Sequence, residues 1–448
     1  MRNAEEMIYF PLRNSLFSPQ LCVKKSDCET TANESCKPTP HIFSQPMKRL
    51  LALTLAALPF PLAAADWPQF RGPDSAGTVA DAVIPAKPKI DWTLPLPGRG
   101  LASPIIVGKK VFVTCSSGPK QEQLHVICVN FDDGTKVWER QLKATGRTMS
   151  HPKTSIAACT PCSDGKRVFA LWSSNDLAAF DFDGNLLWLR GLTVDYPNVS
   201  NSLGMASSPI VIGETLVTVI ENDSESYTVG IDVKTGRNLW KLDRPKAANW
   251  SSPVPWRADA KSPMIAVLQS SKGLTGVDPV SGSVLWNYTE GASTSSSSVV
   301  AQGVIYAPSN GITALAPQAN GSAPEQVWRS KQVNPATISP VVLDGKILAF
   351  NSAGVLSTAD IKSGGSKWKL RLTGPFSGSP VGANGRLVAV NEKGLVQVVD
   401  VTAAEGAALG QLQLPLKEGS KEMILSTPAL CGKHVFIRAD SALWRLGE

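Results

Sequence analysis

The chain has 448 residues, of which 43% are hydrophobic and 18% are charged, and its formal net charge is +7. Its 36 Gly and 33 Pro residues are typical of many short strands joined by tight turns and argue against a mainly helical protein. The basic residues are spread along the chain without basic runs, so nucleic-acid binding is not indicated.

The first recognisable segment is residues 47–65, which read MKRLLALTLAALPFPLAAA. Two basic residues, a short apolar run and small residues at Ala63 and Ala65 predict a secretory signal peptide, cleaved before Asp66. The apolar run is too short to span a bilayer, and no Cys follows the cleavage site to carry a lipid anchor. We therefore expect a periplasmic or secreted mature protein without a transmembrane span.

Residues 1–46 precede this signal, where a functional segment would block recognition by the export machinery. We expect translation to begin at Met47, so that residues 1–46 are an extension that is either not translated or disordered. Five cysteines remain after residue 65. Because this number is odd, at least one thiol is expected to stay unpaired unless it bonds another chain.

Two disulfides are compatible with the sequence. Cys115 and Cys128 lie at the end of one predicted strand and within the next, which allows a cross-strand bond. Cys159 and Cys162 flank the beginning of a strand, and we interpret them as a local disulfide or two packed thiols. A redox-active pair would normally sit at a helix N-terminus, and zinc would need two more ligands that the spacing of the histidines does not supply. No metal site is predicted.

From Asp66 onward one pattern recurs: a turn headed by Asp or Asn, then Gly, three residues and a Trp that begins an apolar strand. Asp and Asn side chains bond the backbone just ahead of them and Gly supplies positive φ, which makes a hairpin corner. A Trp at a fixed distance from this corner can pack over the neighbouring repeat. The predicted docking residues are Trp92, Trp138, Trp188, Trp240, Trp286, Trp328 and Trp368.

A Ser-Pro or Thr-Pro pair opens most repeats, as at Ser103-Pro104 and Thr427-Pro428. Each repeat then reads as four short strands over roughly 40 to 50 residues, the period of a propeller blade. A row of sandwich domains would not place the same turn and Trp at this period. Seven full units run over 102–142, 151–192, 204–245, 249–290, 294–332, 336–372 and 376–415.

The segment from Met423 to the C-terminus supplies only three strands, and the strand that carries Trp92 precedes the first full unit. Joining the two completes an eighth blade and leaves no free sheet edge at the closure. The predicted fold is therefore all-β: an eight-bladed β-propeller of four-stranded antiparallel blades over residues 66–448, closed by pairing of N- and C-terminal strands.

The stretch Asp66–Pro73, DWPQFRGP, together with these repeats, resembles the secreted quinoprotein-like propellers with PQQ-like repeats, which include relatives of the BamB-type outer-membrane assembly scaffold. The resemblance covers residues 66–448 and implies the propeller fold. The family divides into enzymes that use pyrroloquinoline quinone (PQQ) and non-enzymatic scaffolds. The quinone users have adjacent cysteines near the cofactor, which this sequence lacks, and Cys162 is followed by Ser163 instead of the His of a haem-attachment motif.

These signatures favour a binding or scaffolding protein of the cell envelope, with no cofactor, no catalytic residues, a monomeric state and other envelope or secreted proteins as partners. One alternative is a PQQ-dependent alcohol dehydrogenase-like quinoprotein with calcium. Another is a carbohydrate- or polymer-binding propeller that uses Trp250 and Tyr196 as stacking platforms.

In a propeller the loops between blades share one face with the loops between the second and third strands. The first two loops between blades are the longest and are therefore suited to a specific surface. The candidate binding residues on this face are His151, Lys153, Tyr196, Asn201, Trp250, Asn351 and Asn391.

Overall fold

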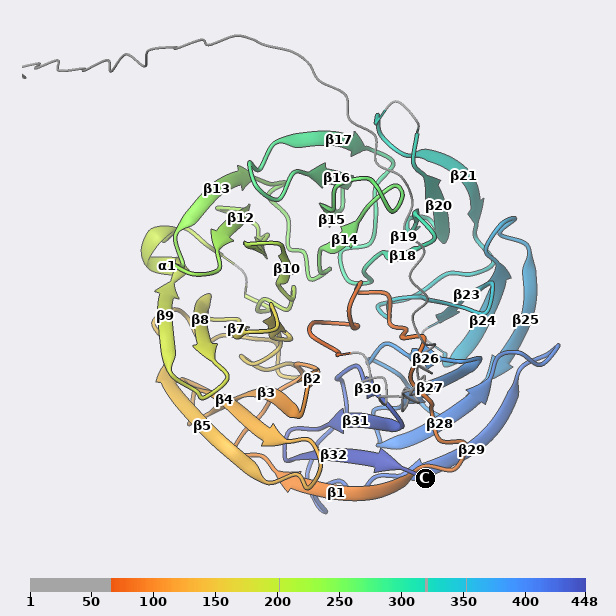
Figure 1. Cartoon of the computed structure of the whole chain (residues 1–448), viewed down its shortest axis with the longest axis horizontal. Helices are drawn as coiled ribbons and strands as arrows, with labels where there is room; N and C mark the ends of the chain where they lie inside the picture. Colours follow the sequence, from red (N-terminus) through yellow and green to blue (C-terminus); the bar gives the residue numbers. More distant parts are fainter. Residues whose placement is uncertain (1–65, 201, 319–320, 352) are drawn as a thin grey trace, which may run out of the picture. The chain divides into compact units, whose positions relative to one another are not determined.

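The computed structural model describes residues 66–200, 202–318, 321–351 and 353–448. These residues form 32 strands in eight four-stranded antiparallel sheets, which are the blades of a closed ring (Figure 1). The only helix among them is a single turn, α1 (Leu192–Asp195). The predicted eight-bladed propeller is confirmed. The expected signal peptide, the extension before it and the candidate residue Asn201 lie outside the described residues.

The first four blades follow one another along the chain, each with its inner strand first. Blade 1 contains β2 (Ile105–Val107), β3 (Lys110–Ser117), β4 (Gln123–Asn130) and β5 (Lys136–Lys143). Blade 2 contains β6 (Cys162–Ser163), β7 (Arg167–Leu171), β8 (Asp176–Asp181) and β9 (Leu186–Gly191). Blade 3 contains β10 (Ile210–Ile212), β11 (Thr215–Ile220), β12 (Tyr227–Asp232) and β13 (Asn238–Asp243). Blade 4 contains β14 (Val254–Trp256), β15 (Ile265–Ser270), β16 (Gly273–Val277) and β17 (Val284–Tyr288).

The next three blades repeat this order. Blade 5 contains β18 (Val299–Ala301), β19 (Val304–Pro308), β20 (Ile312–Ala316) and β21 (Glu325–Ser330). Blade 6 contains β22 (Val341–Leu343), β23 (Lys346–Phe350), β24 (Val355–Asp360) and β25 (Ser366–Arg371). Blade 7 contains β26 (Val381–Ala383), β27 (Arg386–Val390), β28 (Leu395–Asp400) and β29 (Ala407–Gln413).

Blade 8 joins the two ends of the described chain. Its inner strands are β30 (Ala429–Cys431), β31 (His434–Arg438) and β32 (Ala442–Gly447), and its outer strand is β1 (Lys89–Pro95). β1 pairs antiparallel with β32, with Trp92 opposite Arg445 and Leu94 opposite Leu443. The predicted closure through the strand of Trp92 is therefore confirmed. We call the junction between blades 8 and 1 the closure seam.

A chain of hydroxyl-to-amide hydrogen bonds links the inner ends of the blades. In each bond the backbone N–H of one blade's opening Ser or Thr donates to the hydroxyl oxygen of the next blade's Ser or Thr. The seven bonds connect Ser103, Thr160, Ser208, Ser252, Ser297, Ser339, Ser379 and Thr427 in turn, at 2.9–3.0 Å. At the closure seam the buried Ser103 hydroxyl has no partner among the described residues. Small hydroxyl residues are thus selected here because they both fit near the axis and satisfy buried amides.

The outer strands dock through the repeated tryptophans. The indole rings of Trp92, Trp138, Trp188, Trp240, Trp328 and Trp368 fill the space that a Cβ would take at Gly134, Gly184, Gly236, Gly282, Gly364 and Gly406 of the following blade. Five of these indoles also donate to a carbonyl in that turn; Trp240, for example, donates to Pro279 O at 2.8 Å. Trp286 packs edge to face on Trp256 of its own blade, with ring centroids 5.7 Å apart. The turn glycine therefore gives both positive φ and room for a ring.

The segment before β1 closes one end of the central channel. It pairs with blade 1 through Trp67 and Ile106, and with blade 7 through Thr78 and Gly382. These contacts lie on the face of the turns between first and second strands, and Figure 1 shows the segment in orange inside the ring. Buried side chains of the segment share one core with blades 1, 7 and 8. The motif DWPQFRGP thus belongs to a plug. We call the opposite face, which carries the connections between blades and the turns between second and third strands, the loop face.

All five described cysteines are buried free thiols, so neither disulfide considered from the sequence forms in the structure. Phe112 lies opposite Cys128 and His125 opposite Cys115 in the β3–β4 ladder. Because side chains alternate along a strand, Cys115 and Cys128 point to opposite faces of blade 1 and belong to different cores. Cys159 and Cys162 share a core cluster without a bond, and burial raises the pKa of Cys159 to about 12.

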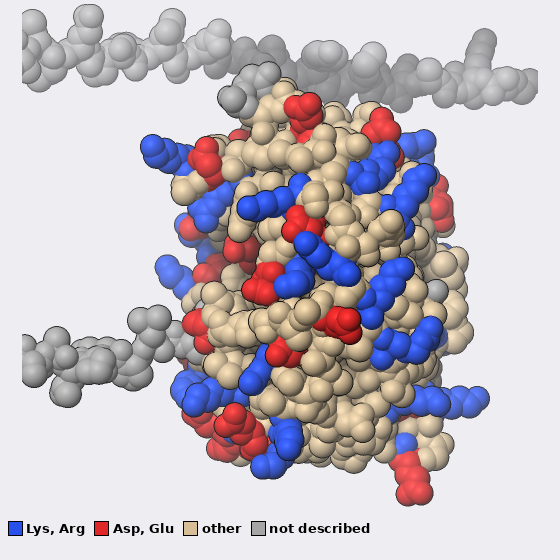
Figure 2. Space-filling model, turned by 90° about the vertical axis from the view of Figure 1, so that its right-hand side faces the viewer, with Lys and Arg blue, Asp and Glu red and all other residues tan. Residues whose placement is uncertain are grey.

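Charged residues of both signs lie on the face shown in Figure 2. On the side of the molecule in Figure 2, Lys and Arg alternate with Asp and Glu and do not merge into a single basic patch. Within the described part of the chain, no helix is both long and apolar enough to cross a membrane.

Candidate functional site

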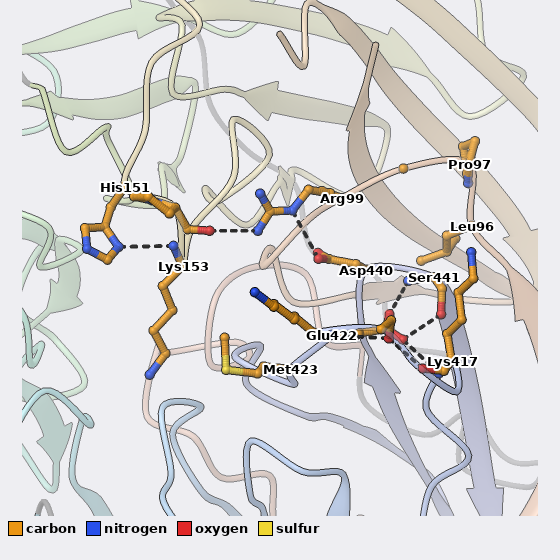
Figure 3. A pocket seen from close by; sticks show the side chains of 14 residues that line it. Leu96, Pro97, Arg99, His151, Lys153, Lys417, Glu422, Met423, Asp440 and Ser441 are labelled. Carbon is orange, nitrogen blue, oxygen red and sulfur yellow. Dashed lines mark hydrogen bonds and ion pairs between the residues drawn. The ribbon is translucent and has the colours of Figure 1, made fainter. Parts of the chain in front are cut away.

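A pocket with a volume of about 850 Å³ lies on the loop face beside the closure seam (Figure 3). We call it the seam pocket. The connections from blade 7 to 8, from 8 to 1 and from 1 to 2 enclose it together with the β31–β32 turn. Its lining residues are Leu96, Pro97, Gly98, Arg99, His151, Pro152, Lys153, Lys417, Ser420, Lys421, Glu422, Met423, Asp440 and Ser441.

Arg99, in the connection from blade 8 to 1, is bonded to the connection from blade 1 to 2 and to the β31–β32 turn. Its Nε donates to Asp440 Oδ2 at 3.2 Å and its Nη2 donates to Pro152 O at 3.2 Å. Asp440 also accepts from the Gly100 amide at 2.9 Å, and the Arg99 backbone forms a bridge with Ser116 of β3. Figure 3 shows this guanidinium between Asp440 and the His151 loop. The arrangement fixes the pocket wall at the closure seam.

Glu422 holds the connection between blades 7 and 8 against blade 8. One carboxylate oxygen accepts from the Ser441 amide, and the other accepts from Ser441 Oγ at 2.9 Å and from the Lys417 amide at 3.2 Å. Both oxygens are therefore occupied by groups of the loop and the adjacent turn (Figure 3). The Lys417 and Lys421 side chains are exposed and form no ion pair among the described residues.

Two of the predicted candidates, His151 and Lys153, lie in the pocket wall. His151 Nδ1 accepts from the Lys153 amide at 3.1 Å, and the Thr154 hydroxyl donates to His151 O at 2.9 Å. The Lys153 ammonium forms an ion pair with Glu392 at 2.7 Å, and Glu392 also accepts from Ser377 Oγ. This loop is therefore folded by its own polar groups and tied to blade 7.

Trp250 lies elsewhere, in a cavity on the propeller axis with a volume of about 190 Å³. Phe70 of the plug also lines this cavity, together with the opening Ser and Thr residues of several blades. The Trp250 indole donates to Gly204 O at 2.8 Å, which fixes the orientation of its ring.

Asn351 and Asn391 shape turns between second and third strands. The Asn391 side-chain oxygen accepts from the Lys393 and Leu395 amides, both at 2.9 Å, and its NH₂ donates to Thr373 O. Asn351 accepts in the same way from two amides of its own turn. Both asparagines are engaged in folding the loop face and contribute nothing to the seam pocket.

Tyr196 belongs to an aromatic cluster at the outer edge of blades 2 and 3. Its ring lies 4.4 Å from that of Tyr227 and 5.3 Å from the Lys241 ammonium, and its hydroxyl accepts from Asn238. Burial raises the pKa of the Tyr227 phenol. Trp250 lines the axial cavity, so the two aromatic residues proposed as stacking platforms lie in different parts of the propeller.

Sequence reasoning missed Arg99, Asp440, Lys417, Lys421 and Glu422. The last three stand in the charged stretch KEGSKE, residues 417–422, within the connection that leads to the incomplete C-terminal blade. This charged stretch is the feature of the sequence that could have indicated the site. The contact of Arg99 with Asp440 had no local signal, since 341 positions separate the two residues.

No group of three or more His, Cys, Asp or Glu side chains among the described residues is arranged to hold a metal ion. Burial raises the pKa of each described thiol, to about 12 for Cys128 and about 11 for Cys431, so these cysteines are held as neutral thiols.

Eight four-stranded blades closed by strands from both ends, with docking tryptophans, define a β-propeller of the PQQ-like repeat class. The chain belongs to the family of the outer membrane protein assembly factor BamB, whose sequence model matches residues 80–225, 200–352 and 309–442. The curated proteins include no match to the chain.

Solved structures share the fold at low sequence identity. BamB from Moraxella catarrhalis has a TM-score of 0.60 at 12% identity, covering 81% of this chain and 98% of that one. Quinohemoprotein alcohol dehydrogenase from Comamonas testosteroni has a TM-score of 0.64 at 11% identity, covering 86% and 81%. Quinohemoprotein alcohol dehydrogenase ADHIIG from Pseudomonas putida HK5 has a TM-score of 0.62 at 12% identity, covering 86% and 80%. At these identities the similarity shows a shared fold only, so the function must be argued from the residues of the site.

Proposed function

We propose that this chain is a binding or scaffolding propeller of the cell envelope that engages a partner protein through the seam pocket and the loop face around it. The observation that carries the proposal is the pocket itself, in which three connections and one turn enclose about 850 Å³. Membership of a family named for an outer membrane protein assembly factor supports an envelope role.

The pocket wall is suited to binding because it is held in place before a partner arrives. The Arg99, Glu422 and Lys153 side chains each tie a connection to a neighbouring blade. A surface that is already ordered loses less conformational entropy on association. We further propose that the protein is exported by the segment at residues 47–65 and acts as a monomer in the periplasm or outside the cell.

A photo-crosslinking amino acid at position 420 tests this function in cells. Ser420 is exposed in the pocket wall, whereas Ser363 is an equally exposed control in a turn on the opposite face. The proposal expects a discrete crosslinked envelope protein from position 420 and none from position 363. Identical adduct patterns at both positions, or none at either, would contradict it.

A PQQ-dependent dehydrogenase is the second candidate, because alcohol dehydrogenases share the fold and Trp250 lines the axial cavity. The described lining of that cavity fits the cofactor poorly: it contains no carboxylate to ligate calcium, and the chain has no adjacent cysteines. Adding PQQ and calcium and following cofactor absorbance and dye reduction with alcohols distinguishes the two. Turnover of an alcohol would contradict the scaffold proposal. If PQQ does not bind, the dehydrogenase candidate is excluded.

A further inference from the structure

We propose that the seam pocket recognises an acidic, extended segment of a partner polypeptide. This inference rests on the proposed binding function and names the chemistry of the bound segment. It is carried by the distribution of charge in the pocket, by the apolar residues between the charges and by the pocket's size.

The carboxylates of the pocket are already satisfied within the protein. Asp440 accepts from Arg99 and from the Gly100 amide, and both oxygens of Glu422 accept from Ser441 or the Lys417 amide. Because these acids face the loops that they hold, they are poor partners for an incoming cation. A cationic ligand would have to break contacts that build the wall.

The cations of the pocket are less fully engaged. Lys417 and Lys421 are exposed and have no acidic partner among the described residues. Figure 3 shows the Lys417 side chain extending beside Leu96. The Lys153 ammonium pairs with Glu392, which also accepts a hydrogen bond from Ser377. This single carboxylate leaves the ammonium with N–H donors for another acceptor. Three ammonium groups around one cavity favour a ligand with several negative charges.

Apolar side chains lie between these charges. Leu96, Pro97, Pro152 and Met423 line the same cavity, and they offer contact area that an inorganic anion cannot use. A volume of about 850 Å³ suits a short segment of chain and is within the usual range for ligand sites, roughly 300–1,000 Å³. A peptide in which acidic and aliphatic residues alternate matches both features, whereas a highly charged small anion matches only the first.

Fluorescence anisotropy with a labelled peptide of alternating Asp and Leu tests the inference on the intact protein, with an Asn/Leu peptide as the uncharged control. We expect saturable binding of the acidic peptide, weakened by salt because the charges are exposed. The double variant K417A/K421A should bind about tenfold more weakly or worse. The matched variant K166A/K362A, which removes two exposed lysines from turns of the opposite face, should bind like the unaltered protein.

Equal binding by the two double variants, or equal binding of the Asn/Leu peptide, would overturn the inference. Binding to anionic phospholipid vesicles is measured with the same variants. If K417A/K421A loses more affinity for the vesicles than for the peptide, the pocket is assigned to a membrane surface and the inference is overturned. The proposed function is judged separately: a partner crosslinked at position 420 in K417A/K421A as efficiently as in the unaltered chain would refute the acidic segment alone.

Discussion

The closure seam differs from the seven junctions between blades that follow one another in the chain. At those seven junctions, an amide of one blade donates to a hydroxyl of the next, near the axis. At the closure seam the Ser103 hydroxyl has no partner within the described part of the chain. There the buried Arg438 donates to Thr114 O at 2.8 Å, and Arg99 pairs with Asp440. Local motifs thus join neighbours, whereas side chains distant in sequence close the ring.

The seam pocket also lies at this junction. The regular junctions share the hydroxyl-to-amide bond, and pockets of about 390 and 580 Å³ also lie on the loop face near blades 2 and 6. At the closure seam the Ser103 hydroxyl has no such partner among the described residues, and charged side chains line the seam pocket there. The site that we propose for partner binding therefore lies at the junction without the repeated hydrogen bond.

The largest expected effect is the loss of a docking tryptophan at a regular junction. Trp240→Ala removes a buried indole that fills the space beside Gly282 and donates to Pro279 O. We expect a loss of about 3–5 kcal/mol in the free energy of unfolding, the usual cost of truncating a buried Trp. Urea unfolding followed by circular dichroism measures it. A loss as small as that of an exposed substitution would show that the blades do not depend on this contact.

The second prediction is a loss of stability that begins at the closure seam. Arg438→Met keeps the length of a fully buried side chain but leaves Thr114 O without its donor, so we expect a loss of about 2–3 kcal/mol. Hydrogen exchange should accelerate in β1 and β32 before it does in blade 4. Arg237→Met, at an exposed arginine, is the control. Uniform acceleration around the ring would contradict a distinct seam.

Removing a hydroxyl from the chain of hydroxyl-to-amide hydrogen bonds should lower stability less, and two serines of that chain can be compared directly. Ser252→Ala deprives the buried Ser208 amide of its acceptor and should cost about 1–2 kcal/mol. Ser103→Ala removes a hydroxyl that no described residue bonds and should change stability by less than about 0.5 kcal/mol. Thermal unfolding of the two variants side by side checks this. Equal losses would mean that the seam is linked like the other junctions.

The propeller fold could be predicted from the sequence because the motifs that build each blade are local. The Asp or Asn turn, the Gly and the Trp stand within a few residues of one another, so the blades and the strand of Trp92 could be predicted. The site could be predicted only in part. His151 and Lys153 were found because the topology places their loop on the loop face, whereas the Arg99–Asp440 pair depends on the ring being closed. Asn351 and Asn391 form turn hydrogen bonds outside the seam pocket, and the sequence could not separate the two roles because turn formation and ligand binding favour the same side chain.

The smallest expected effect is a pH dependence within blade 8. Burial, and then the nearby Arg445, hold the pKa of His434 below its ordinary value of 6.5. The unfolded chain therefore binds a proton more readily than the folded one, and stability is lost as pH falls below 6.5. His434→Gln should reduce the shift in urea midpoint between about pH 7.5 and about pH 5.5. An unchanged shift would exclude His434 as its source.

Hydrogen exchange of the intact protein with and without the Asp/Leu peptide tests the seam pocket as the binding site most directly. We predict protection at residues 96–101, 151–154, 417–423 and 438–441, with no change in the turns of the opposite face. Protection confined to the axial cavity or to the outer strands, or no protection at saturating peptide, would contradict the account.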